Sequence, residues 1–203
     1  MPQREEPRGA PGVARDPLLI VLAGPNGAGR STLFDLVIGR ETGLPFVNAD
    51  LIARQQFGSN APRLSHAAAN VAAQERERLI RGRRSFVTET VFSHPSKLDL
   101  LDTARAAGYL VELHVVMVPE DLAVHRVRIR VRYGGHDVPE NKIRSRYRRL
   151  FGVVVEAIAK ADNAFVYDNS STRHPLRKVA SFRDGRLVGS PSWPCWTPAV
   201  LRA

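Results

Sequence analysis

Cysteine, aromatic side chains and long apolar runs are all scarce in this chain. A single cysteine, Cys195, occurs in 203 residues, so no internal disulfide can form, and the composition predicts a reducing compartment, which we take to be the cytoplasm. No apolar run approaches the roughly 20 residues of a membrane-spanning helix, so we expect no membrane partner. Residues 1–16 lack the apolar stretch of a secretory signal, and we expect them to form a flexible arm.

Acidic residues are also few, and the basic excess is local. The chain has 30 Lys and Arg against 20 Asp and Glu, a net charge of +10, and eight arginines lie between Arg126 and Arg149. Such a stripe can bind nucleic acid, face solvent or form a phosphate pocket. Nucleic-acid binders usually combine basic charge with exposed aromatics or a known module. Because aromatics make up only 7% of this chain, we favour a phosphate pocket and keep RNA binding as a third hypothesis.

A nucleotide-binding loop is the strongest motif. The apolar run Leu18–Ala23 leads into Gly-Pro-Asn-Gly-Ala-Gly-Arg-Ser-Thr, which matches the P-loop pattern G-x-x-x-x-G-K-[ST] except at Arg30. Glycines let successive backbone N–H groups point at one phosphate, and the next helix adds its positive N-terminus. The alternative is a plain strand–helix turn. We expect ATP to bind at Gly24, Asn26, Gly27, Ala28, Gly29, Arg30, Ser31 and Thr32.

Two features of this loop concern the reaction itself. The Ser31 hydroxyl is the expected ligand for Mg²⁺, which takes few protein ligands. Arg30 stands where the motif has lysine, and arginine is longer, planar and forked. Phosphoryl transfer depends on placing charge accurately, so a shift of about 1 Å can cost on the order of 10²-fold in rate. The swap therefore predicts either an altered kinase or a nucleotide-binding protein without catalysis.

Apolar strands alternate with helical patterns along the chain, which predicts an α/β fold with helices on both faces of a parallel sheet. We expect strands at residues 18–23, 45–48, 85–91, 110–118 and 165–167, followed by a hairpin at 179–182 and 186–188. We expect helices at 31–41, 50–57, 65–82 and 95–107, and from 119 onward. Residues 17–190 then form a single P-loop kinase domain, and residues 191–203 form a tail rich in Pro and Trp with no assigned role.

One segment has a conflicting periodicity. Residues 125–132 read His-Arg-Val-Arg-Ile-Arg-Val-Arg, an alternation that by period alone favours a strand. As a helix, the same residues place Arg126 and Arg130 one turn apart on one side. We predict a helix because no turn separates this segment from Pro119.

Two carboxylates follow predicted strands. In parallel α/β sheets the carboxyl ends of the strands form the ligand crevice. Asp50 is positioned there to accept a proton from a substrate hydroxyl, although it could also cap the helix that follows. Glu89 and Thr90 are expected to bind substrate hydroxyls; a buried ion pair between Glu89 and an arginine is the alternative.

A hinge separates two arginine-rich stretches. Gly134-Gly135-His136 gives the chain freedom to move there, so the flanking helices could close over the phosphates as a lid. Arg126 and Arg130 would then neutralise the transferring phosphoryl group. His136 would contact substrate or cap a turn. We expect most of the arginines between 144 and 149 to face solvent.

Together these motifs resemble those of the zeta-toxin family of P-loop small-molecule kinases. The similar segments are the P-loop, Asn-Ala-Asp50, Thr-Glu89-Thr-Val-Phe-Ser-His and Arg126-Val-x-x-Arg130-Val-x-x-Gly-Gly-His136-x-Val-Pro. The resemblance implies ATP-dependent phosphorylation of a hydroxyl, with Asp50 as base, Glu89 as substrate ligand and Arg126 and Arg130 on the phosphates. The best-known activity of the family is 3′-phosphorylation of UDP-N-acetylglucosamine, but short members need not share that substrate. One chain gives no basis for inferring an antitoxin partner.

Overall fold

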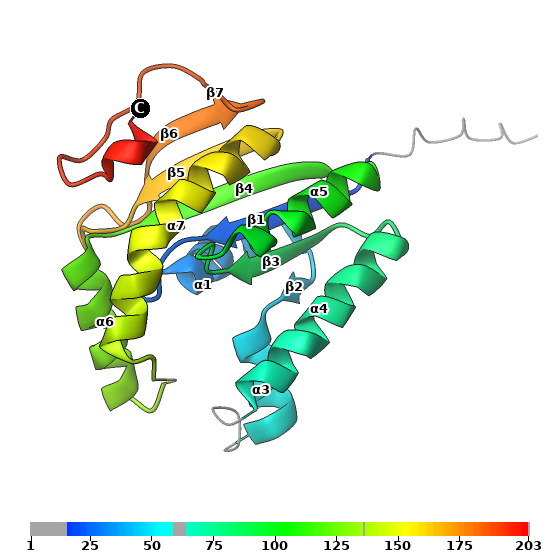
Figure 1. The fold of residues 1–203 in the computed structure, drawn as a ribbon, viewed down its shortest axis with the longest axis horizontal. Helices are drawn as coiled ribbons and strands as arrows, with labels where there is room; N and C mark the ends of the chain where they lie inside the picture. The colour runs from blue at the N-terminus through cyan, green and yellow to red at the C-terminus, as the bar shows by residue number, and fades with distance from the viewer. Residues whose placement is uncertain (1–15, 59–63, 136, 203) are drawn as a thin grey trace, which may run out of the picture.

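A seven-stranded, mostly parallel sheet forms the centre of the protein in a computed structural model that describes residues 16–58, 64–135 and 137–202 (Figure 1). The strand order is β2-β3-β1-β4-β5-β6-β7. The strands are β1 (Leu18–Ala23), β2 (Phe46–Val47), β3 (Phe86–Thr90), β4 (Leu110–Met117), β5 (Asn163–Asp168), β6 (Arg177–Arg183) and β7 (Arg186–Leu187). β1 to β5 run parallel, whereas β6 and β7 form the predicted antiparallel hairpin. The predicted fold class is confirmed.

Helices cover both faces of the sheet, because β1 is apolar on both sides. Leu19 and Val21 pack in one cluster with α4 (Ser65–Arg81), α5 (Asp99–Ala106) and α7 (Glu140–Lys160). Ile20 and Leu22 face the opposite way, toward α1 (Arg30–Leu33) and the π-helical turn η1 (Phe34–Ile38). This continuous burial is typical of a parallel strand covered on both faces.

Of the remaining helices, α3 (Ala49–Phe57) and α6 (Glu120–Arg132) begin directly after the carboxyl ends of β2 and β4. α2 (Gly39–Thr42) completes the helix begun by α1 and η1. The 3₁₀ turn η3 (Pro95–Lys97) precedes α5, so the helix predicted over 95–107 is divided in two. α6 is helical through the ambiguous segment, as predicted, because Val124 and Val127 are buried along one side of it. Figure 1 shows α6 and the start of α7 standing opposite α3 and α4, beyond the strand ends.

The C-terminal residues fold back onto the sheet layer. The Ser192 N–H donates to the Val179 carbonyl, and Trp193 and Trp196 pack against the main core. The 3₁₀ turn η4 (Ala199–Leu201) contacts α7 through the buried Leu201. Within the described part of the chain, no helix combines the length and apolar character needed to cross a membrane. The proposed flexible arm lies almost entirely outside the described residues.

Candidate active site

Three neighbouring strands end at the same place and bring the P-loop and the polar residues together. β1 pairs with β3 so that Leu22 lies opposite Glu89. Leu22 is two residues before Gly24, where the P-loop begins. β2 pairs with the other edge of β3, with Val47 opposite Thr88. Asn48, Glu89 and Gly24 therefore lie together at the carboxyl ends of the strands, as expected for parallel strands.

The P-loop lies in close contact with α6, and its glycines make that contact possible. Gly27 has a φ of +77°, and a Cβ there would lie 2.7 Å from the Ala123 carbonyl oxygen. Any other side chain would push α6 away from the loop. Gly29 is the N-cap of α1 in the left-handed region, and no side chain caps this helix end. The free N–H groups of the first turn are suited to an anion.

A cavity of about 260 Å³ lies over this loop, and we call it the phosphate cavity. Gly27 to Thr32 form one side, and Arg126 and Arg130 of α6 line it as well. Burial lowers the pKa of both arginines, yet arginine stays charged at any ordinary pH. The structure thus brings residues 27–32 of the predicted set and both arginines of α6 to one cavity, whereas Gly24 and Asn26 do not line it.

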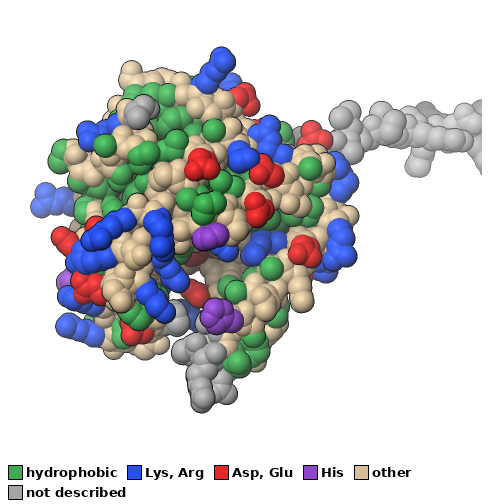
Figure 2. All heavy atoms as spheres, in the orientation of Figure 1, with side chains coloured by type: hydrophobic (Ala, Val, Ile, Leu, Met, Phe, Trp, Pro, Cys, Tyr) green, Lys and Arg blue, Asp and Glu red, His purple; other side chains and the backbone are tan. Residues whose placement is uncertain are grey.

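A second cavity of about 380 Å³, which we call the adjoining cavity, shares the lining residues Arg30 and Glu89 with the phosphate cavity. Asn26 of the P-loop lines it as well. Asp50 and Thr90 line it too, and its basic wall comes from other elements: His66, Lys97 and Arg146. Figure 2 shows this face of the molecule hollowed between the α3–α4 side and the α6–α7 side, where Lys and Arg side chains gather. A ligand in the adjoining cavity would lie next to the phosphates of a nucleotide.

Glu89 is paired with Arg30, and the ion pair is nearly buried. Arg30 Nε and Nη2 both lie 2.9 Å from Glu89 Oε1, and each side chain is 10% exposed. The other oxygen, Oε2, accepts from Ser31 Oγ at 3.0 Å and from Asn48 Nδ2 at 2.8 Å. The alternative of an ion pair with an arginine is therefore what the structure contains, and any substrate hydroxyl must share an already occupied carboxylate.

Asp50 does not cap α3, contrary to the alternative raised from the sequence. Asn48 is the N-cap, and its Oδ1 accepts from the N–H groups of Asp50 and Leu51 at 2.8 and 3.1 Å. An Asn with extended φ and ψ satisfies the first N–H groups well, which leaves Asp50 in the first helical turn. The Asp50 side chain is exposed and lines the adjoining cavity.

The other predicted residues have mixed outcomes. Asn26 lines the adjoining cavity, and its Oδ1 is buried without a hydrogen-bond partner among the described residues. Of the arginines between 144 and 149, most of which were expected in solvent, Arg148 and Arg149 are exposed, whereas Arg146 lines that cavity. Arg144 instead joins an ion-pair network with Glu120, Asp121 and Glu140. His136 lies outside the described residues.

Asn169, which sequence reasoning missed, holds the P-loop from behind. It follows β5, is 8% exposed, and its Nδ2 donates to the Ala28 carbonyl at 2.7 Å. Its Oδ1 accepts from the Leu176 N–H, and its own N–H donates to Met117. A polar residue directly after a buried strand is a signal for such a role, but nothing in the sequence links positions 28 and 169.

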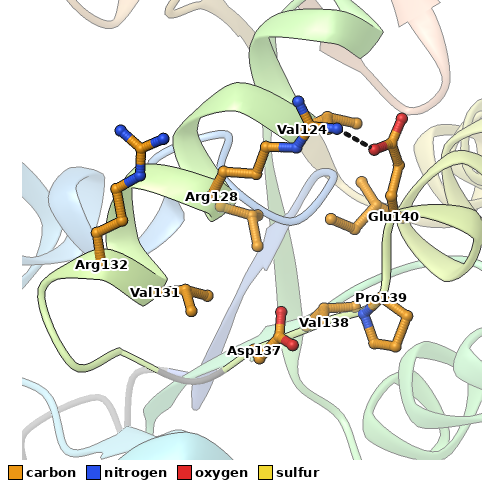
Figure 3. Close-up of a pocket in the computed structure, with 10 residues that line it drawn as sticks. Val124, Arg128, Val131, Arg132, Asp137, Val138, Pro139 and Glu140 are labelled. Carbon is orange, nitrogen blue, oxygen red and sulfur yellow. Dashed lines mark hydrogen bonds and ion pairs between the residues drawn. The ribbon is translucent and has the colours of Figure 1, made fainter.

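A third cavity, of about 390 Å³, lies behind α6 rather than over the P-loop. Val124, Val131 and Val138 form its apolar lining, and Arg128 and Glu140 pair across its edge (Figure 3). No P-loop residue lines this cavity. Because α6 presents valines to it and Arg126 and Arg130 to the phosphate cavity, packing between α6 and α7 determines where those arginines lie.

A comparison with known families decides what this arrangement belongs to. The zeta toxin family profile matches residues 8–174, most of the chain. The chain belongs to the zeta toxin family. The resemblance expected from the motifs is confirmed, and it covers every element that forms the phosphate cavity and the adjoining cavity.

Solved structures share the fold at low sequence identity. The AvrRxo1-ORF1:AvrRxo1-ORF2 complex, crystallised with sulphate ions and with ATP, matches with a TM-score of 0.68 and 19% identity over 86% of this chain. This protein spans only 61% of the length of that chain. The PezAT toxin–antitoxin system of Streptococcus pneumoniae matches with a TM-score of 0.62 and 15% identity, over 93% of this chain and 84% of the other. No curated protein matched.

The family match and the shared α/β fold therefore agree over the part of the chain that forms both cavities.

Proposed function

We propose that the protein transfers the γ-phosphate of ATP to a hydroxyl group of a small anionic molecule. The observation that carries this proposal is the pair of neighbouring cavities, which share Arg30 and Glu89 and open on either side of them. ATP would place its phosphates on the N–H groups of Gly27–Thr32, and the acceptor would occupy the adjoining cavity beside Asp50. Positioning two substrates in this way supplies much of the catalysis in phosphoryl transfer.

The basic wall of the adjoining cavity supports a negatively charged acceptor. Lys97 and Arg146 line it, and Arg76 lies in a smaller cavity that continues past Glu89. Burial lowers the pKa of Arg76 because its positive charge has lost part of its hydration. A bound anion would stabilise that charge. A nucleotide sugar such as UDP-N-acetylglucosamine has hydroxyls at one end and a diphosphate further along, so it suits this cavity.

Magnesium fits the residues at the phosphate cavity. Ser31 offers a hydroxyl oxygen, and no cluster of three or more His, Cys, Asp or Glu that could hold a metal by itself occurs in the part of the chain described. Mg²⁺ usually binds through one or two protein oxygens plus substrate phosphates and water. When bound, the ion would neutralise charge on the β- and γ-phosphates.

In the proposed reaction Asp50 accepts the proton of the acceptor hydroxyl as that hydroxyl oxygen bonds to the γ-phosphorus. The bond from the γ-phosphorus to the β–γ bridging oxygen breaks, and ADP leaves with that oxygen. Arg126 and Arg130 bind the phosphates, and closure of α6 excludes water. Glu89, Thr90 and His136 are proposed to orient the acceptor. All of these residues lie within residues 17–190, which we propose as the catalytic domain.

A nucleotide-binding protein without catalysis is the second candidate, and one observation favours it. Arg30 lines the phosphate cavity, but its guanidinium is paired with Glu89, so its charge is already partly neutralised before a γ-phosphate binds. Incubation with Mg-ATP and a panel of nucleotide sugars and nucleosides, read by mass spectrometry, distinguishes the two. A product heavier by one phosphoryl group supports the kinase. Nucleotide binding with no product across the panel supports the second candidate.

A further inference from the structure

Arg30 has its guanidinium nitrogens bonded to the protein itself. Nε and Nη2 lie against Glu89, while Nη1 donates to the Gly24 carbonyl and lies 3.4 Å from the Pro25 carbonyl oxygen. The side chain therefore joins the first residues of the P-loop to the end of β3. A lysine has one nitrogen on a flexible stem and cannot span these partners at once, whereas the planar fork of arginine can.

The bonds made by Arg30 continue toward the acceptor side. Glu89, held by Arg30, accepts from Asn48 Nδ2, and Asn48 in turn caps the turn of α3 that carries Asp50. Four donors thus fill both oxygens of Glu89: two from Arg30, one from Ser31 and one from Asn48. Removing the Arg30 pair leaves a nearly buried carboxylate without its counter-ion, so Glu89 would shift and Asn48 with it.

The cationic role of the usual P-loop lysine has another source in this protein. Arg126 and Arg130 line the phosphate cavity from α6, opposite the N–H groups of the loop. Both come from a helix whose position depends on its packing against the loop at Gly27.

We propose that Arg30 is a positioning residue for Glu89, Asn48 and Asp50 and not a ligand of the phosphates, whose charge is left to Arg126 and Arg130 as in the proposed function. Arginine at position 30 is then an adaptation of the acceptor side and does not weaken nucleotide binding. This inference rests on the proposed function only in taking the adjoining cavity beside Asp50 as the place of the acceptor. The contacts of Arg30 stand independently of it.

Two measurements on Arg30→Gln test the proposal. The first is binding of the non-hydrolysable analogue adenylyl imidodiphosphate with Mg²⁺, followed by calorimetry and compared with Arg130→Gln. We expect Arg130→Gln to weaken binding by about tenfold, in line with the loss of one charge-assisted contact, and Arg30→Gln to weaken it clearly less. Arg40→Gln is the matched control, because Arg40 is exposed on α2 away from both cavities.

The second measurement is amide hydrogen exchange. We expect Arg30→Gln to speed exchange more in peptides covering residues 46–53 and 86–92 than in the hairpin at 177–187, which reports only the loss of global stability. Glu89→Gln should favour the same two segments, and the effects of the two changes should not add in the double variant, because both residues act through one contact. Arg30→Lys should not restore the wild-type pattern.

Either of two results would overturn the proposal: a loss of analogue affinity in Arg30→Gln as large as in Arg130→Gln, or exchange that speeds up no more at the two segments than at the hairpin. If Arg30→Gln does not fold, the double variant with Glu89→Gln lacks both charges and carries the same affinity comparison. A wild-type protein that fails to bind the analogue contradicts the proposed function instead, and the exchange result still decides the role of Arg30.

Discussion

Arg30 and Glu89 illustrate how a single pair can govern both stability and function. An ion pair this little exposed offsets the cost of burying its two charges only while both partners are present. Here the carboxylate is further supported by Ser31 and Asn48, so its geometry is well defined. Losing one partner costs more than losing both.

The stability of the pair can be measured with a double-mutant cycle. We expect Arg30→Gln to lower the free energy of unfolding by about 3–5 kcal/mol, because it leaves a buried carboxylate unpaired. The double variant Arg30→Gln/Glu89→Gln should lose much less, since an amide replaces the charge. Urea unfolding of all four proteins gives the comparison. Losses that simply add would mean that the two side chains do not interact.

Asp50 is exposed and lines the adjoining cavity, and its role as the base is a prediction. We expect Asp50→Asn to lower kcat by about 10²-fold or more while nucleotide affinity stays nearly unchanged, because a base acts only in the transition state. Since Asn48 makes the helix cap, the variant should unfold at the same temperature as the wild type. Phosphate transfer and thermal melting check both statements. An unchanged rate would remove Asp50 from the mechanism.

Among the helices, α6 and α7 carry most of the basic charge, and a hydrogen bond from α7 holds the short connection between β4 and α6. Tyr147 of α7 donates from its hydroxyl to the Val118 carbonyl, just before α6 begins, at 2.8 Å. Burial raises the pKa of Tyr147 to about 12. This hydroxyl therefore stays protonated in the folded protein at pH values where an unfolded tyrosine already ionises.

A pH dependence of stability follows from that shift. An unfolded tyrosine has a pKa of about 10, so Tyr147 contributes stability that is fully present below that pH and is lost as the pH rises toward 12. We expect the free energy of unfolding of the wild type to fall more steeply across this range than that of Tyr147→Phe. Urea unfolding at a series of alkaline pH values gives both slopes. Parallel curves for the two proteins would show that the hydroxyl is not held as described.

How far each element could be predicted depends on whether its cause is local. The strand–loop–helix over residues 18–33 could be predicted because apolar run, glycines and helix start are consecutive in the sequence. The helix over 125–132 was harder to predict, since its alternating arginines imitate a strand and only the burial of Val124 and Val127 shows the helical side. The division of residues 95–107 into a 3₁₀ turn and α5 was not predicted.

Contacts between distant residues explain the rest of what sequence reasoning missed. Glu89 was identified as a candidate, but its ion pair spans 59 positions, and the bond from Asn169 to the P-loop spans 141. No local sequence pattern could reveal contacts between residues that lie so far apart in the chain. Residues 48–50 show the same limit on a shorter scale, because two neighbouring polar residues could each have capped α3.

The whole molecule has an excess of positive charge. Its two candidate ligands, RNA and ATP, should therefore differ in how their binding depends on salt. A net charge of +10 would attract any polyanion, RNA included. Binding that depends on many phosphate contacts weakens steeply with salt, whereas ATP held largely by the N–H groups of the P-loop should respond less. Ligand binding compared at low and high salt therefore separates a general basic surface from a specific nucleotide site.

Stabilisation by nucleotide is the most direct test of that site, because a ligand that binds only the folded protein raises its melting temperature. We expect Mg-ATP at a hundredfold excess over its Kd to add about 2.7 kcal/mol to the free energy of unfolding. Arg126→Gln and Arg130→Gln should each reduce the shift, since both line the phosphate cavity, whereas Arg40→Gln should not. Chelation of Mg²⁺ should reduce the shift in the wild type. No shift at millimolar Mg-ATP would contradict nucleotide binding, and equal shifts in all variants would place the phosphates away from α6.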